Sequence, residues 1–213
     1  MVSGLRRDEL RPDDIRRAVE VAAQAMTPLN DADWSAKAGD LDWDCRRTLG
    51  HTNDAVVWYA ANLAMRSADD VDVVDFDREA RIERMLSTLV AGGNVLAATV
   101  EGSAVGARGY HGAGMADATG FLAMGCDETL VHTYDVCAGL GTPFEGPADI
   151  AGRIVERIFP WAPDHADPWE LLLWCNGRTA LPGHARLGSE WGWWCAPLDE
   201  WDGVAYTDRW PGD

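Results

Sequence analysis

A glutamate and a histidine stand four residues apart in this sequence, at Glu128 and His132. On a helix this spacing places both side chains on one face, about one turn apart, so that they can bind the same ion. A carboxylate oxygen and an imidazole nitrogen suit zinc, iron, manganese or nickel. The same spacing is also common in surface pairs that bind no ion, so the pair by itself does not decide for a metal.

His51 is the candidate third ligand. Three protein ligands leave at least one position for water, a thiolate or a substrate, which is typical of a catalytic metal site and not of a structural one. Asp54 and Asp135 each follow a candidate histidine ligand by three residues, so each could accept a hydrogen bond from the second ring nitrogen and fix that ring. An exposed helix carboxylate is an equally good interpretation of both.

Four further residues are candidates for the site. His111 lies in a glycine-rich stretch and could act as an acid or base, although an ordinary loop histidine fits as well. Arg178 could bind a substrate carboxylate, or could simply neutralise a helix C-terminus. Trp43 and Trp58 could form the wall of a cofactor or substrate pocket beside His51.

Two predicted helices would position the three candidate ligands. The first runs from about Asp44 to Met65 and contains His51, which shares a helix face with Trp58. The second runs from about Phe121 to Ala138 and contains Glu128 and His132; glycines and a proline come after it as stop signals. The sequence therefore predicts that two separate helices bring the ligands together.

The remaining pattern is also mainly helical. Apolar residues at helical spacing predict helices from Pro12 to Met26, from Ile82 onward and from Ile150 to Ile158. Gly92 and Gly93 would weaken the second of these, and the glycine-rich stretch 102–120 is expected to be a long loop. Asp167, Pro168 and Glu170 predict the start of a short helix, although a buried strand is an alternative for the apolar run after them. From Gly183 the tryptophan-rich tail is expected to be irregular.

Composition excludes some classes of function. The formal net charge of −17 disfavours nucleic-acid partners, which are bound largely through lysine and arginine. No apolar run reaches the roughly 20 residues that cross a bilayer, and the N-terminus carries no hydrophobic leader, so we expect a cytoplasmic protein without a membrane partner. The five cysteines are scattered, and we expect reduced, mostly buried thiols, including Cys126 two residues before Glu128.

Two segments carry a resemblance to a known family. WDCRRTLGH at residues 43–51 and DETLVHTYD at residues 127–135 resemble the signature helices of the DinB-like superfamily, and more narrowly its mycothiol-dependent maleylpyruvate isomerase branch. The resemblance covers about residues 12–160 and implies an all-α, DinB-like four-helix bundle with short additional C-terminal helices and an irregular, tryptophan-rich tail. It implies a metal-binding bundle over residues 1–145 and a C-terminal extension over 146–213. His51, Glu128 and His132 match the family's metal ligands, usually of zinc.

The resemblance implies a function as well. A metal with an open position would bind a low-molecular-weight thiol such as mycothiol and lower its pKa, and the thiolate would attack an electrophilic small molecule in an S-transfer or isomerisation. The sequence leaves two alternatives: a thiol-independent hydrolase or cyclase of the same fold, and a binding protein without catalysis. It indicates a small-molecule substrate and either a monomer or a homodimer.

Overall fold

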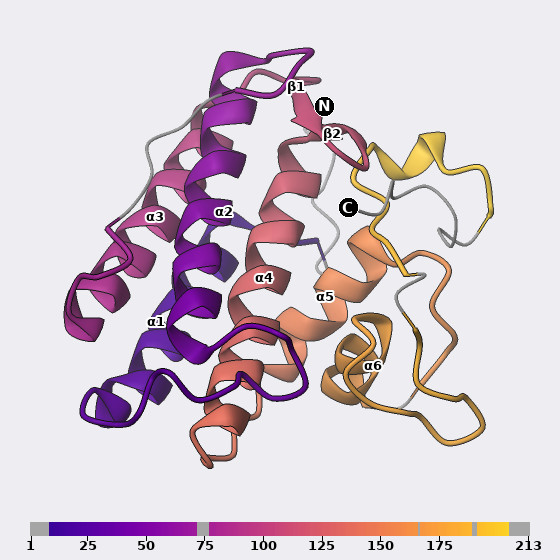
Figure 1. The fold of residues 1–213 in the computed structure, drawn as a ribbon. Coiled ribbons are helices and arrows are strands. Elements are labelled where there is room, and N and C mark those ends of the chain that lie inside the picture. Colours follow the sequence, from indigo (N-terminus) through magenta and orange to yellow (C-terminus); the bar gives the residue numbers. More distant parts are fainter. Residues whose placement is uncertain (1–8, 72–76, 166, 189–190, 205–213) are drawn as a thin grey trace.

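The computed structural model describes residues 9–71, 77–165, 167–188 and 191–204. Figure 1 shows a mainly helical fold with one small hairpin. The elements within the described residues are α1 (Pro12–Met26), α2 (Cys45–Met65), α3 (Ile82–Gly102), β1 (Arg108–His111), β2 (Gly114–Asp117), α4 (Ala118–Gly139), α5 (Ala148–Ile158) and α6 (Pro168–Cys175), with short 3₁₀ turns at Thr27–Leu29 and Leu198–Glu200. The all-α prediction is confirmed.

The first four helices form the core of the fold. Helix α1 packs against α3 and α4, and α2 packs against the same two helices from the other side (Figure 1). Asp44 caps α2 by accepting a hydrogen bond from the backbone N–H of Arg47, which places the start of this helix where the sequence predicts it. Because α2 and α4 are neighbours, His51 can face Glu128 and His132.

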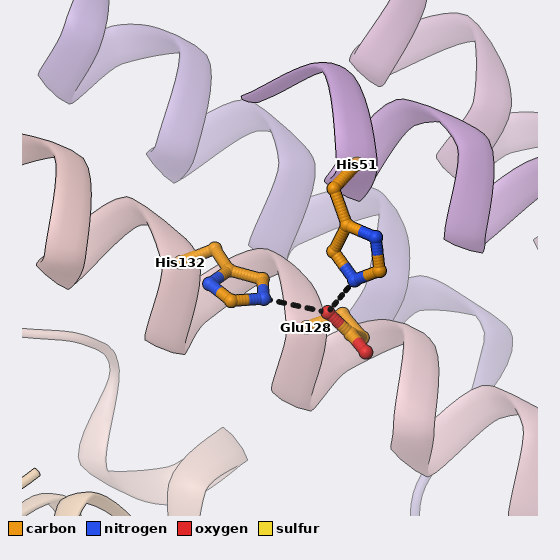
Figure 2. Close-up of side chains that lie close together, drawn as sticks. All are labelled: His51, Glu128 and His132. Atoms are coloured by element: carbon orange, nitrogen blue, oxygen red, sulfur yellow. Dashed lines mark ion pairs between the residues drawn. The ribbon is translucent and has the colours of Figure 1, made fainter. Parts of the chain in front are cut away.

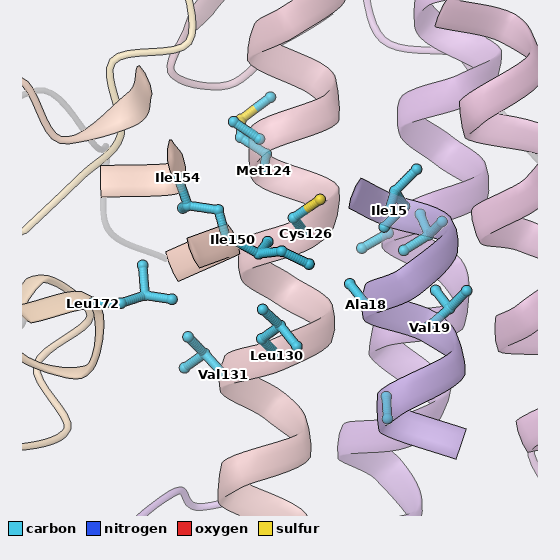
Figure 3. Close-up of a cluster of buried hydrophobic side chains, with 14 of the residues drawn as sticks. Ile15, Ala18, Val19, Met124, Cys126, Leu130, Val131, Ile150, Ile154 and Leu172 are labelled. Carbon is cyan, nitrogen blue, oxygen red and sulfur yellow. The ribbon is translucent and has the colours of Figure 1, made fainter. Parts of the chain in front are cut away.

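Helix α4 is the centre of the structure. Figure 3 shows Ile15 and Ala18 of α1 on one side of it, and Ile150 and Ile154 of α5 on the other. Its apolar residues face every direction, as expected for a helix that neighbours surround. Asp127, Glu128 and Asp135 are nevertheless buried on this helix. A buried charge is costly unless it is paired or binds a metal, so these carboxylates require partners.

The glycines of α3 allow close packing and do not end the helix. Helix α3 continues through Gly92 and Gly93 to Gly102, and the expectation that these glycines weaken it stays a prediction. A Cβ atom added at Gly93 would lie 2.6 Å from Cγ1 of Val19. The absence of a side chain at Gly93 therefore lets α1 approach α3 closely, and the packing offsets the low helix propensity of glycine.

The predicted loop over residues 102–120 is wrong in its second half. Strands β1 and β2 pair as an antiparallel hairpin, and α4 already begins at Ala118, where Asp117 caps it. A Cβ at Gly109 would lie 2.3 Å from the backbone oxygen of Asn62, so this glycine lets the hairpin lie directly on α2. The glycines of this segment thus mark a close approach of two backbones, a pattern that resembles a loop in the sequence.

The C-terminal part packs beside α4. Helix α5 contacts α4 and α6, and α6 begins at the predicted cap, where Asp167 accepts from the N–H of Glu170. The helical interpretation of this segment is confirmed against the strand alternative. The tryptophan-rich tail beyond Gly183 is largely irregular where the structure describes it. None of the described helices has the length and apolar character required to span a bilayer.

Candidate metal centre

Three side chains from two helices converge on one point. The ligand atoms of His51, Glu128 and His132 all lie within 4.8 Å of one another. Figure 2 shows His51 of α2 and His132 of α4 approaching the same carboxylate oxygen of Glu128. Nε2 of His132 lies 3.0 Å from Oε2 of Glu128, and Nε2 of His51 lies 3.4 Å from it. The predicted grouping of these residues is confirmed, and they could hold a divalent metal.

The environment of Glu128 fits a metal better than a simple ion pair. Oε1 accepts a hydrogen bond of 3.3 Å from the hydroxyl of Tyr59, whereas the buried Oε2 has no hydrogen-bond partner despite its two imidazole neighbours. Burial alone would raise the pKa of Glu128, but the facing imidazoles of His51 and His132 hold it well below its usual value. A carboxylate oxygen without a hydrogen bond and two imidazole nitrogens form the donor set of a divalent metal.

His132 is oriented by a chain of buried polar contacts. Nδ1 of His132 lies 3.0 Å from Oδ2 of Asp135, and Asp135 in turn accepts two hydrogen bonds from Arg178, of 2.7 and 3.1 Å. The predicted contact between Asp135 and the second ring nitrogen of His132 is confirmed. Burial opposes charge on His132, but the neighbouring carboxylates of Asp135 and Glu128 outweigh it and raise its pKa to about 9. Such a partner behind a metal-binding histidine fixes the ring orientation.

His51 has a different environment. Its side chain is 37% exposed, against 13% for His132. The ring of Trp43 stands edge-on to it at a centroid distance of 4.9 Å. The predicted role of Asp54 is wrong, because its Oδ2 accepts from Arg78 and its Oδ1 has no hydrogen bond. Among the described residues, none forms a hydrogen bond with Nδ1 of His51.

A second buried network stands beside Glu128, and the sequence did not indicate it. Asp127 accepts hydrogen bonds from the side chains of Asn176, at 2.8 Å, and Trp193, at 2.9 Å. Burial raises the pKa of Asp127 to about 7 against the effect of these donors. The network ties α6 and the tail to α4 next to the candidate ligands. Its three members are up to 66 residues apart in the sequence, and no spacing rule links them.

A cavity of about 470 Å³ opens onto the candidate metal centre. His51 and Glu128 line it, together with Trp58, Tyr110 and residues of the tail and hairpin. Trp58 thus lies in the wall of a pocket beside His51, as predicted, whereas Trp43 contacts His51 but is not among the lining residues. A role for either tryptophan in binding a cofactor stays a prediction.

Two other cavities lie near Glu128 and Arg178. A space of about 100 Å³ is lined by Glu128, His132 and Arg178. It shares Arg178 with a larger cavity of about 460 Å³ that also contains Arg186. Both guanidinium groups are already bonded to carboxylates, Arg178 to Asp135 and Arg186 to Asp40. The prediction that Arg178 binds a substrate carboxylate stays a prediction.

His111 lies at the end of β1 and lines the cavity beside His51. It is 5% exposed, and burial lowers its pKa from 6.5 to about 4. Its Nδ1 accepts a hydrogen bond of 3.1 Å from the backbone N–H of Ala113, so the neutral ring carries its proton on Nε2. An acid or base role for His111 stays a prediction.

All five cysteines are buried and free of disulfides, as predicted. Burial raises the pKa of each thiol. Since the thiolate is the reactive form, none of these side chains is suited to act as a nucleophile at neutral pH.

No protein-family model, no curated protein and no solved structure matches this chain. The structure supports a mainly helical arrangement with a four-helix core and a His-Glu-His group whose glutamate is buried. The link to the DinB-like superfamily therefore rests on the two sequence segments that contain the candidate ligands.

Proposed function

We propose that this protein is a metal-dependent enzyme that activates a low-molecular-weight thiol of the mycothiol type for S-transfer to, or isomerisation of, an electrophilic small molecule. One observation carries the proposal: the ligand atoms of His51, Glu128 and His132 lie within 4.8 Å of one another, and His51 and Glu128 line a cavity of about 470 Å³. Three protein ligands leave room for a reactant, and zinc is the metal we expect, with nickel, iron or manganese also suited to the donors. A metal held there would supply a reactive thiolate at neutral pH by lowering the pKa of the thiol.

The side chains around the site have distinct tasks in this proposal. His51, Glu128 and His132 hold the metal, and Asp135 keeps His132 in the orientation needed for binding. His111, whose ring is neutral, forms part of the cavity wall beside His51. Trp58 also lines this cavity and supplies an apolar surface for a bound substrate.

The chain's own cysteines support an external thiol. All five are buried, with pKa values raised by burial, so a thiolate reagent must come from a cosubstrate. The resemblance of residues 43–51 and 127–135 to a mycothiol-dependent branch indicates the type of thiol.

The test begins with the metal and continues with the thiol. Elemental analysis of protein purified without added metal is expected to give one equivalent per chain, and well below one equivalent for His51→Ala. The Glu20→Gln variant, which changes an exposed carboxylate of α1, is the matched control and should retain the metal. In cobalt-substituted protein, titration with a small thiol should then produce the near-ultraviolet absorption of a sulfur ligand.

Each step can contradict the proposal. Protein without metal, in both the purified and the reconstituted form, would overturn it. A metal-loaded protein that binds no thiol and turns over electrophiles without one would replace it by the thiol-independent hydrolase or cyclase, with water as the reagent. A metal shell filled by protein atoms would indicate a binding protein without catalysis.

A further inference from the structure

The charged side chains in the wall of the cavity beside His51 are acidic. Its charged lining residues are Asp54, Asp70 and Glu128, and neither lysine nor arginine is present among the described residues that line it. Arg78 bonds to Oδ2 of Asp54, but Oδ1 of the same carboxylate is buried without a partner. Glu128, 8% exposed, lies where the cavity meets the candidate metal centre, and its Oε2 faces the imidazoles of His51 and His132. The described lining of the cavity therefore carries carboxylates and neither lysine nor arginine.

Aromatic rings form much of the same wall. Trp58 has ring neighbours at centroid distances of 5.7 Å to His111 and 6.4 Å to Tyr110, and His111 lies 5.7 Å from Trp193. The indole N–H of Trp58 donates a hydrogen bond of 2.9 Å to Asp70, which fixes the ring at the rim. Aromatic rings attract cations through their electron-rich faces, tryptophan most strongly.

The two ends of the cavity differ in what they can bind. Glu128 and His51 mark the inner end, where a metal would present positive charge. Trp58 and the exposed Asp70 stand together elsewhere on the wall, with no positive side chain beside them among the lining residues described. A volume of about 470 Å³ accommodates a molecule that reaches both.

We propose that this cavity takes a substrate carrying an organic ammonium group, bound against Trp58 and Tyr110 with Asp70 as the counter-charge, while its reactive end lies near Glu128 and His51. The inference rests on the proposed function, because it assumes that this cavity is the substrate side of the metal centre. It names the substrate class: an electrophile that bears a positive charge away from its reactive carbon.

Three probes of nearly the same shape test the charge preference. Choline, its neutral isostere 3,3-dimethylbutan-1-ol and the anion 3,3-dimethylbutanoate are titrated by calorimetry into the metal-loaded full chain. We expect choline to bind about tenfold or more tightly than the neutral alcohol, consistent with a cation–π contact and a nearby carboxylate. Equal affinity for choline and the alcohol would overturn the proposal.

Matched variants locate the binding. Asp70→Asn keeps an oxygen that can accept from Trp58 but removes the charge, and we expect it to lower the preference for choline about threefold or more at low salt. Asp69→Asn removes the neighbouring exposed charge, which does not line the cavity, and should leave the preference unchanged. Trp58→Leu should remove most of the preference for choline over the neutral alcohol. Unchanged preference in both Trp58→Leu and Asp70→Asn would place the cation elsewhere and overturn the proposal.

The outcome is separable from that of the proposed function. Selective choline binding at Trp58 in a protein that binds no thiol would refute the thiol chemistry and retain the cation site. Thiol binding to the cobalt-substituted protein, together with equal affinity for choline and the alcohol, would retain the thiol chemistry and refute the cation site.

Discussion

The two histidines of the candidate metal centre lie in contrasting regions. His132 stands on the buried helix α4, where Asp135 and Arg178 fix its ring from behind. His51 stands on α2 at the side of the cavity, 37% exposed, with the edge of Trp43 against it. Both place Nε2 near the same oxygen of Glu128, but one does so within a hydrogen-bonded network and the other through packing.

The two histidines differ because buried charged groups need partners, and those partners also fix neighbouring side chains. A charged group inside α4 is costly without a partner, so Asp135 and Glu128 are stable there because histidines and an arginine surround them. The same contacts pre-orient His132. His51 is partly in solvent and can change its rotamer at little cost. We therefore expect a rigid half of the site on α4 and an adjustable half on α2.

Loss of the shared carboxylate should have the largest effect. Glu128 contacts both histidines, so Glu128→Gln removes the one anionic ligand that links the two halves. Mutation of a residue that only orients a metal ligand lowers metal affinity by up to roughly 100-fold. We expect Glu128→Gln, which removes a ligand itself, to lower it by more than this. Competition with a chelator measures it. Retention of wild-type affinity would show that the two halves do not share a metal.

Removal of each histidine compares the halves directly. Both His132→Ala and His51→Ala should weaken metal binding strongly, but the loss at His132 should be roughly 2- to 12-fold greater. Immobilising a free side chain costs roughly 0.5–1.5 kcal/mol. His51 must be immobilised when the metal binds, whereas His132 is already held in place, so His132 contributes more to the affinity by this factor. Chelator competition on both variants checks the ratio. A larger loss at His51 would contradict the assignment of the rigid half.

The two aspartates that stand three residues after the histidines form a matched pair. Asp135→Asn should lower metal affinity about 10- to 100-fold, because Asp135 orients His132. Asp54→Asn should leave the affinity close to that of the wild type, because Asp54 bonds to Arg78.

Asp135→Asn also leaves Arg178 without its counter-charge, which should destabilise the fold by about 3–5 kcal/mol. The double variant Asp135→Asn/Arg178→Gln separates the two effects: stability should partly recover, as followed by thermal unfolding, whereas metal affinity should not. Full recovery of the affinity would show that Asp135 acts through stability alone.

His111, in the wall of the cavity, should make a smaller, pH-dependent contribution to the stability of the fold. Its pKa is lowered by burial from 6.5 to about 4, so the folded protein keeps this ring neutral while the unfolded chain takes up a proton. Stability from this group is complete above pH 6.5 and is lost as the pH falls toward 4, by up to about 3 kcal/mol. His111→Gln should flatten this part of the profile, as followed by denaturant unfolding. An unchanged slope would contradict the burial of a neutral imidazole.

Short-range patterns in the sequence were enough to predict the helices of the site and part of its chemistry. Helical spacing and caps placed α2 and α4, and the spacing of Glu128 and His132 put two ligands on one helix face. Asp135 was found because three residues again span about one turn. Asp54 has the same spacing from His51, yet Arg78 takes its carboxylate, and nothing in the local sequence distinguishes the two aspartates.

The contacts that the sequence missed are long-range. The hairpin at β1 and β2 depends on Gly109 meeting the backbone of α2, and a glycine-rich segment looks the same whether it is a loop or a close contact. Asn176 and Trp193 reach Asp127 from two distant segments, so the network depends on how α6 and the tail pack. Such packing is a property of the whole fold.

X-ray absorption at the edge of the bound metal identifies the ligand atoms themselves, and so tests whether His51, Glu128 and His132 bind one metal with an open position. We predict two imidazole nitrogens, one carboxylate and at least one further light-atom ligand that a small thiol replaces with sulfur. A shell that contains cysteine sulfur before any thiol is added, or that keeps both imidazoles in His51→Ala, would contradict the account.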